Sequence, residues 1–91
     1  MERYLVTIFA NDKPVLVERI LRVVRHRGFA IKQILATQNQ ESHLAKIEIV
    51  VDSNRPITLI TNQIEKLWDV TEVNTSNLDI EKDELLAAYK I

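Results

Sequence analysis

The sequence contains no cysteine, which excludes several kinds of chemistry. A disulfide framework, a thiolate zinc site and a thiol nucleophile all need cysteine, and a chain without it suits a reducing compartment. No stretch combines a basic start with a long apolar run, and none reaches the length that crosses a bilayer. We therefore expect a cytoplasmic protein that does not enter a membrane.

Glycine, net charge and histidine are also scarce. The single glycine, Gly28, excludes a glycine-rich phosphate loop. Twelve Lys and Arg against 13 Asp and Glu give a formal net charge of −1, so the chain has no overall positive field for nucleic acid. His26 and His43 have no acidic partner at metal-site spacing, and no serine lies in a nucleophile elbow. We expect neither catalytic residues nor a bound metal.

Four segments are rich in β-forming residues and too short for amphipathic helices. The first is RYLVTIFA, and the last is VTEVNTSNL. Between them, FAIKQILATQ and SHLAKIEIVV lie on either side of the polar turn NQES, an arrangement typical of an antiparallel hairpin. The predicted strands cover residues 3–10, 29–38, 42–51 and 70–78.

Two segments between these strands show apolar residues at three- and four-residue spacing, which predicts helices. The first should begin at Pro14, with Asn11 or Asp12 as its cap, and end in a left-handed cap at Gly28. The second should follow a capped start in DSNRP and end near Trp68.

The resulting order of strand, helix, strand, strand, helix, strand favours an α+β fold. Its simplest form is the ferredoxin-like βαββαβ arrangement, a four-stranded antiparallel sheet with two helices on one face. The other face and the edge strands stay uncovered, so we expect a homodimer. The domain should span residues 1–78, and residues 79–91 form a tail whose composition favours a short helix.

The polar face of the first predicted helix has two interpretations. Solvation is one, because Glu18 precedes Arg22 at ion-pair spacing and cations favour a helix C-terminus. Docking on a partner protein is the other, because arginine is enriched at protein interfaces. The candidate partner-binding residues are Arg22, Arg25, His26 and Arg27.

An RNA-recognition module has the same order of elements. Such modules stack bases on aromatic side chains of the two central strands. Here Tyr4 and Phe9 lie in the first strand, but the other central strand has no aromatic residue. We therefore expect no nucleic-acid partner.

Residues 11–31, NDKPVLVERILRVVRHRGFAI, resemble the opening of an ACT domain. That family usually shows a strand, the pattern D-x-P-G-x-L and a helix ending in R-G-[FY]-x-I. The segment ERILRVVRHRGF is most similar to small regulatory subunits of acetolactate synthase (acetohydroxyacid synthase) of the short isozyme II type. KLWDVTEV resembles that family's KLVDV before the last strand, and the resemblance covers residues 1 to about 78.

The resemblance implies a non-catalytic subunit that binds and activates the catalytic (large) subunit of acetolactate synthase in branched-chain amino-acid biosynthesis. It also implies that this partner carries thiamine diphosphate, Mg and FAD, and that the small chain carries no cofactor. ACT domains of the family pair side by side into an eight-stranded sheet, which agrees with a homodimer. A free-standing ACT-type amino-acid sensor is the alternative, and it would need a ligand instead of a partner.

The resemblance further implies an effector loop between the first strand and the first helix, because several members bind valine there at the pair interface. The positions carried over to this sequence are Asn11, Asp12, Val15, Leu16 and Ala30. Val15 replaces the family's glycine and crowds the loop amide, while Ala30 replaces a common asparagine and cannot hydrogen-bond an amino group. We therefore expect a weak response to valine or none, with Asp12 as an ammonium partner or a helix cap.

Overall fold

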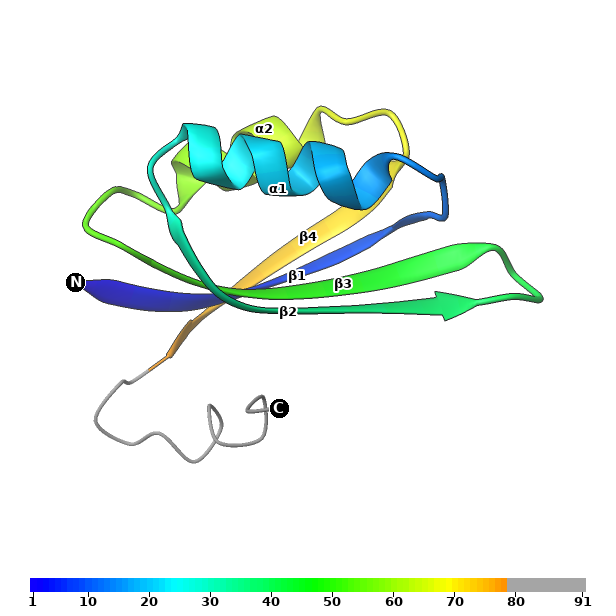
Figure 1. Ribbon diagram of the computed structural model, residues 1–91, viewed down its shortest axis with the longest axis horizontal. Helices are drawn as coiled ribbons and strands as arrows, with labels where there is room; N and C mark the ends of the chain where they lie inside the picture. Colours follow the sequence, from blue (N-terminus) through cyan, green and yellow to red (C-terminus); the bar gives the residue numbers. More distant parts are fainter. Residues whose placement is uncertain (79–91) are drawn as a thin grey trace.

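Six elements in the predicted order form the part of the chain that the computed structural model describes, residues 1–78. They are β1 (Glu2–Asn11), α1 (Leu16–His26), β2 (Ala30–Asn39), β3 (Leu44–Ser53), α2 (Thr58–Glu65) and β4 (Val70–Leu78). The four strands make one antiparallel sheet in the order β2-β3-β1-β4, and both helices cover the same face of it (Figure 1). The ferredoxin-like fold is confirmed. The helix expected in the tail lies outside the described residues.

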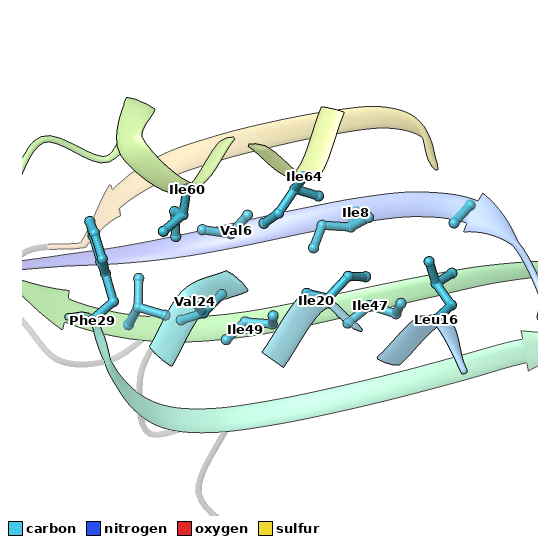
Figure 2. Packing of buried hydrophobic residues seen from close by; sticks show 12 residues of the cluster. Val6, Ile8, Leu16, Ile20, Val24, Phe29, Ile47, Ile49, Ile60 and Ile64 are labelled. Atoms are coloured by element: carbon cyan, nitrogen blue, oxygen red, sulfur yellow. The ribbon is translucent and has the colours of Figure 1, made fainter. Parts of the chain in front are cut away.

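The hydrophobic core lies between the helices and one face of the sheet. Side chains alternate between the two faces of a strand, so even-numbered residues of β1 and odd-numbered residues of β3 point toward the helices. Val6 pairs with Ile49 and Ile8 with Ile47, and all four side chains are fully buried. Figure 2 shows the helix residues that pack against them: Leu16, Ile20, Val24, Ile60 and Ile64.

Helix α1 begins later than predicted and without the expected cap. Its N-cap residue is Val15, which makes no side-chain capping hydrogen bond. The side chain of Asp12 instead accepts a hydrogen bond from Nε2 of Gln38 at 3.1 Å, and Asn11 is still part of β1. The prediction that Asn11 or Asp12 caps the helix was wrong. The Asp12 carboxylate accepts its hydrogen bond from Gln38 of β2 instead of from the first turn of α1.

Helix α1 ends in the left-handed cap that the glycine predicts. Gly28 has φ +81°, and its N–H donates to the carbonyl of Arg25 at 3.0 Å. The N–H of Phe29 donates to the carbonyl of Val24 at 3.2 Å, which completes a Schellman motif. Phe29 and Val24 are both buried in the core, so the cap also fixes the direction in which β2 leaves the helix.

Replacing Gly28 with alanine should lower the free energy of unfolding by about 1–2 kcal/mol, because a Cβ is disfavoured at positive φ. The added Cβ would also lie 3.4 Å from Nε of Arg55. Urea denaturation measures the change, and Gly28→Asn is the matched control since asparagine tolerates this conformation better. Equal stability of Gly28→Ala and the parent would contradict the assignment.

Helix α2 is shorter than its apolar pattern suggested, and it also lacks a side-chain cap. Its N-cap residue is Ile57, and it ends at Glu65 instead of near Trp68. Within DSNRP, the Oγ of Ser53 instead accepts a hydrogen bond from the N–H of Arg55 at 2.9 Å. The predicted capped start was therefore wrong, since Ser53 stabilises the preceding turn.

The sheet face away from the helices is not a continuous apolar surface. Arg3 and Asp52 form a two-pronged ion pair there, with Nε–Oδ1 at 2.6 Å and Nη2–Oδ2 at 2.8 Å. On the same face, Nζ of Lys46 lies 3.7 Å from Oε1 of Glu48 and 5.9 Å from the ring centroid of Phe9. Its buried apolar part is a small cluster of Leu5, Val50 and Leu78, and the exposed Leu35 and Leu44 lie apart from this cluster on the same face. The case for a homodimer therefore rests on the edge strands β2 and β4.

No helix within residues 1–78 is long and apolar enough to cross a membrane. The cytoplasmic location stays a prediction.

Candidate functional site

The loop between β1 and α1 is the candidate effector loop. Backbone hydrogen bonds connect it to the turn between β2 and β3 and to the segment between α2 and β4. The N–H of Asn11 donates to the carbonyl of Asp69 at 2.8 Å. The N–H of Asp12 donates to the carbonyl of His43, also at 2.8 Å, and its carboxylate accepts from Gln38. Asp12 is thus oriented by the β2–β3 hairpin, and one of its carboxylate oxygens already has a donor.

The other candidate effector residues differ in their environments. Val15 is 44% exposed at the start of α1, whereas Leu16 is buried in the core and offers no side chain to a ligand. Ala30 lies at the opposite end of the sheet, because it pairs with Asp52 while Asn11 pairs with Leu44. Those two β3 residues are about 26 Å apart at about 3.3 Å per residue. Within a single chain, Ala30 is therefore too far from the candidate effector loop to contact the same ligand.

The candidate partner-binding residues lie in the C-terminal half of α1 and at its C-cap, Arg27. The side chains of Arg22, Arg25 and His26 are exposed and that of Arg27 is half-buried. Among the described residues, none of the four side chains forms a salt bridge or a hydrogen bond. The ion pair expected between Glu18 and Arg22 is not formed. An ion pair with Glu18 therefore does not account for Arg22, whereas Arg25 and His26 lie in the last turn of α1, where the helix dipole favours positive charge.

A groove runs between α1 and α2, and three of these four residues line it. The groove has a volume of about 400 Å³, and its lining residues are Arg19, Arg22, Val23, His26, Arg27, Gln63 and Leu67. We call it the helix groove. Arg25 is not among its lining residues. It lies about 120° around the helix from Arg19, whereas Arg22, Val23 and His26 lie within about 60° of Arg19, at 3.6 residues per turn.

Comparison with known proteins identifies the family. An ACT domain model matches residues 12–73. The chain is 37% identical over 73 residues to the acetolactate synthase isozyme 2 small subunit of Escherichia coli K12, which is 80% of this chain and 84% of that protein. The chain belongs to the ACT-domain family of acetolactate synthase small subunits.

Solved structures show the same fold. The acetolactate synthase small subunit of Thermotoga maritima superimposes with a TM-score of 0.69 at 25% identity over 88% of this chain, which spans about half, 49%, of that protein. The ACT domain of the GTP pyrophosphokinase of Chlorobium tepidum gives a TM-score of 0.70 at 15% identity. It covers 84% of this chain and 100% of that domain, and supports the fold alone.

Sequence reasoning missed four lining residues of the helix groove in this ACT domain: Arg19, Val23, Gln63 and Leu67. The first two could have been found, because they share one flank of α1 with Arg22 and His26 at helical spacing. The contribution of α2 could not, since nothing local in residues 58–67 shows which side of that helix faces α1.

The aromatic residues of β1 do not form a base-stacking platform. Tyr4 packs against the core under the helices, whereas Phe9 lies on the opposite face beside Lys46. Five positions separate them, so alternation along the strand sends them to different faces. Phe9 is the one aromatic side chain on the open face of residues 1–78. This arrangement gives no support to an RNA-binding function.

Proposed function

We propose that this ACT-domain chain is a non-catalytic regulatory subunit that binds and activates an acetolactate synthase catalytic subunit in the biosynthesis of valine, leucine and isoleucine. The observation that carries the proposal is the 37% identity to the Escherichia coli isozyme 2 small subunit, which extends over 84% of that protein. The unpaired side chains of Arg19, Arg22 and Arg27 support it, because they provide a surface that the domain does not use internally.

Co-purification tests the association directly. The full chain, expressed with a tagged catalytic subunit of an isozyme II acetolactate synthase, should elute with it in a fixed ratio from affinity and size-exclusion columns. Elution of the two proteins in separate peaks at micromolar concentration would contradict the proposal. In this assignment thiamine diphosphate, Mg and FAD belong to the catalytic subunit, and that distribution stays a prediction.

We also propose that two copies pair through the free edge of β2. A two-fold antiparallel pairing would place Ala30 of one copy near Asn39 of the other, beside Gln38, which already contacts Asp12 within each chain. The two separated parts of the effector site would then meet across the pair. Pairing through β4 would leave them apart, because β4 lies at the other edge of the sheet.

Sedimentation equilibrium of the isolated chain at micromolar concentration should therefore give twice the mass of one chain. Leu35, in the middle of β2 and 46% exposed, offers a test of the edge. Replacing it with proline removes a backbone donor and should shift the mass toward that of one chain. A parent chain that sediments as a monomer would contradict the pairing.

Valine should bind this chain weakly or not at all. Recognition of an amino acid needs donors for its carboxylate and acceptors for its ammonium, and each polar group left unpaired costs about 1–3 kcal/mol. Val15 and Ala30 each compromise one such contact. Valine should therefore bind about 30-fold more weakly, or weaker still, than it binds a domain with glycine and asparagine at these two positions. Calorimetric titration with valine, leucine and isoleucine measures this. Saturable valine binding tighter than about 0.1 mM would contradict the prediction, and Val15→Gly with Ala30→Asn should strengthen binding.

A further inference from the structure

We propose that the helix groove is the docking site for an acidic, leucine-bearing segment of the catalytic subunit. The inference rests on the proposed function and adds to it the surface of this chain and the chemistry of the partner. It also distinguishes Arg19 and Arg22, which line the groove, from Arg25, which does not.

The floor of the groove is apolar and partly open. Val23 on α1 and Leu67, two residues after α2, are half-buried, and both pack against the core while still lining the groove. Removing the rest of their surface from water would be favourable at about 25 cal/mol per Å². An occupant therefore needs at least one apolar side chain that points down between the helices, and leucine has a suitable size.

The rim of the groove is positively charged. Arg19 and Arg22 stand on the α1 side and Arg27 at its end, while the lining includes no Asp or Glu. The side chains of these three arginines have no charged or hydrogen-bonded partner in residues 1–78. Arginine forms its strongest contacts with carboxylates and phosphates, through two parallel hydrogen bonds.

The apolar floor favours a protein segment over a nucleic acid as the occupant. A phosphate backbone would leave Val23 and Leu67 without apolar contacts, and the groove lining has no aromatic residue for stacking a base. An acidic segment with leucine satisfies both the rim and the floor. The chemistry of the groove therefore matches the interface pattern of an apolar centre inside a polar rim.

Trp68 adds an independent observation at the same end of the domain. It is the only tryptophan of the chain and follows Leu67 directly in sequence. The residue is 94% exposed. Tryptophan is rarely left so exposed in a monomer and is enriched among the residues that dominate binding energy at interfaces. It follows a lining residue in sequence, and we include it in the proposed docking surface on that ground.

The test compares the affinities of full-length variants for the purified catalytic subunit. Arg19→Glu/Arg22→Glu should weaken binding at least about tenfold and reduce the salt dependence, because two rim charges are reversed. Val23→Ser should also weaken binding, with the salt dependence unchanged. The matched control is Arg25→Glu, at another exposed arginine of the same helix, which should bind within about threefold of the parent. Circular dichroism verifies that each variant is folded.

The outcomes separate the groove from the proposed function. A parent chain that does not bind the catalytic subunit overturns the proposed function and the groove with it. A parent that binds, together with rim variants that bind equally well, overturns the groove alone. If Arg25→Glu loses as much affinity as Arg19→Glu/Arg22→Glu, the groove is overturned, and general attraction between opposite charges explains the binding. If Arg19→Glu/Arg22→Glu changes the sedimentation mass of the isolated chain, the occupant is a second copy and the proposal is wrong.

Discussion

Replacing Ile47 with alanine is expected to lower the free energy of unfolding by about 2–5 kcal/mol. Ile47 lies in the central strand β3, is fully buried, and pairs with Ile8 on one side and Ala36 on the other. The substitution would leave a cavity between the sheet and α1, where Ile20 already fills the space above the strand (Figure 2). A small domain has a total stability of about 5–15 kcal/mol, so much of it would be lost.

The same strand provides the control for this prediction. Leu44 begins β3 but is 48% exposed, so Leu44→Ala removes similar atoms without opening a cavity. We expect its effect on the unfolding free energy to stay within about 1 kcal/mol. Urea denaturation of both variants gives the comparison. Equal losses at Ile47 and Leu44 would contradict the placement of the core.

Replacing Arg3 with methionine should cost about 3–5 kcal/mol at neutral pH, because a buried carboxylate loses its charged partner. The side chain of Asp52 is only 3% exposed and that of Arg3 is 17% exposed. The change removes both hydrogen bonds from the guanidinium to the carboxylate. Thermal or urea unfolding measures the loss. The double variant Arg3→Met/Asp52→Leu should recover much of it, since no charge then remains buried.

The same ion pair predicts how stability depends on pH. Hydrogen bonding from Arg3 holds the pKa of Asp52 below its ordinary value of 3.8, despite the opposing effect of burial. The pair therefore stabilises the fold above the unfolded-state pKa, and this contribution disappears as the pH falls through the lower folded-state pKa. The stability gap between Arg3→Met and the parent should narrow below about pH 4. A gap that stays constant or widens on acidification would contradict the assigned role of Asp52.

Local signals in the sequence predicted most of the fold. The strand expected at residues 70–78 coincides with β4, and the single glycine marks the end of α1 through its positive φ. These features depend on residues close in sequence, namely β-forming runs and a backbone conformation that favours glycine. The order of the elements then restricted the topology to one simple arrangement, which the sheet order confirms.

The features that the sequence did not predict all depend on contacts between distant segments. Asp12 looks like a helix cap, but Gln38 from β2 provides its hydrogen bond instead. The order of elements leaves the open face uncovered, yet Arg3 and Asp52, 49 positions apart in sequence, form an ion pair there. The basic residues of α1 were recognised as a candidate surface, whereas the groove needed Gln63 from α2 and Leu67 from the turn after it. Local spacing contains no information on these partners.

The most direct test of the central claim is a titration of purified acetolactate synthase catalytic subunit with this chain, followed by the rate of acetolactate formation. A regulatory subunit should raise the rate and reach a plateau near a fixed ratio of the two proteins. Arg25→Glu should reach the same plateau, and Arg19→Glu/Arg22→Glu should need at least about tenfold more chain to reach it. A rate that does not change at any concentration of the parent chain would contradict the account.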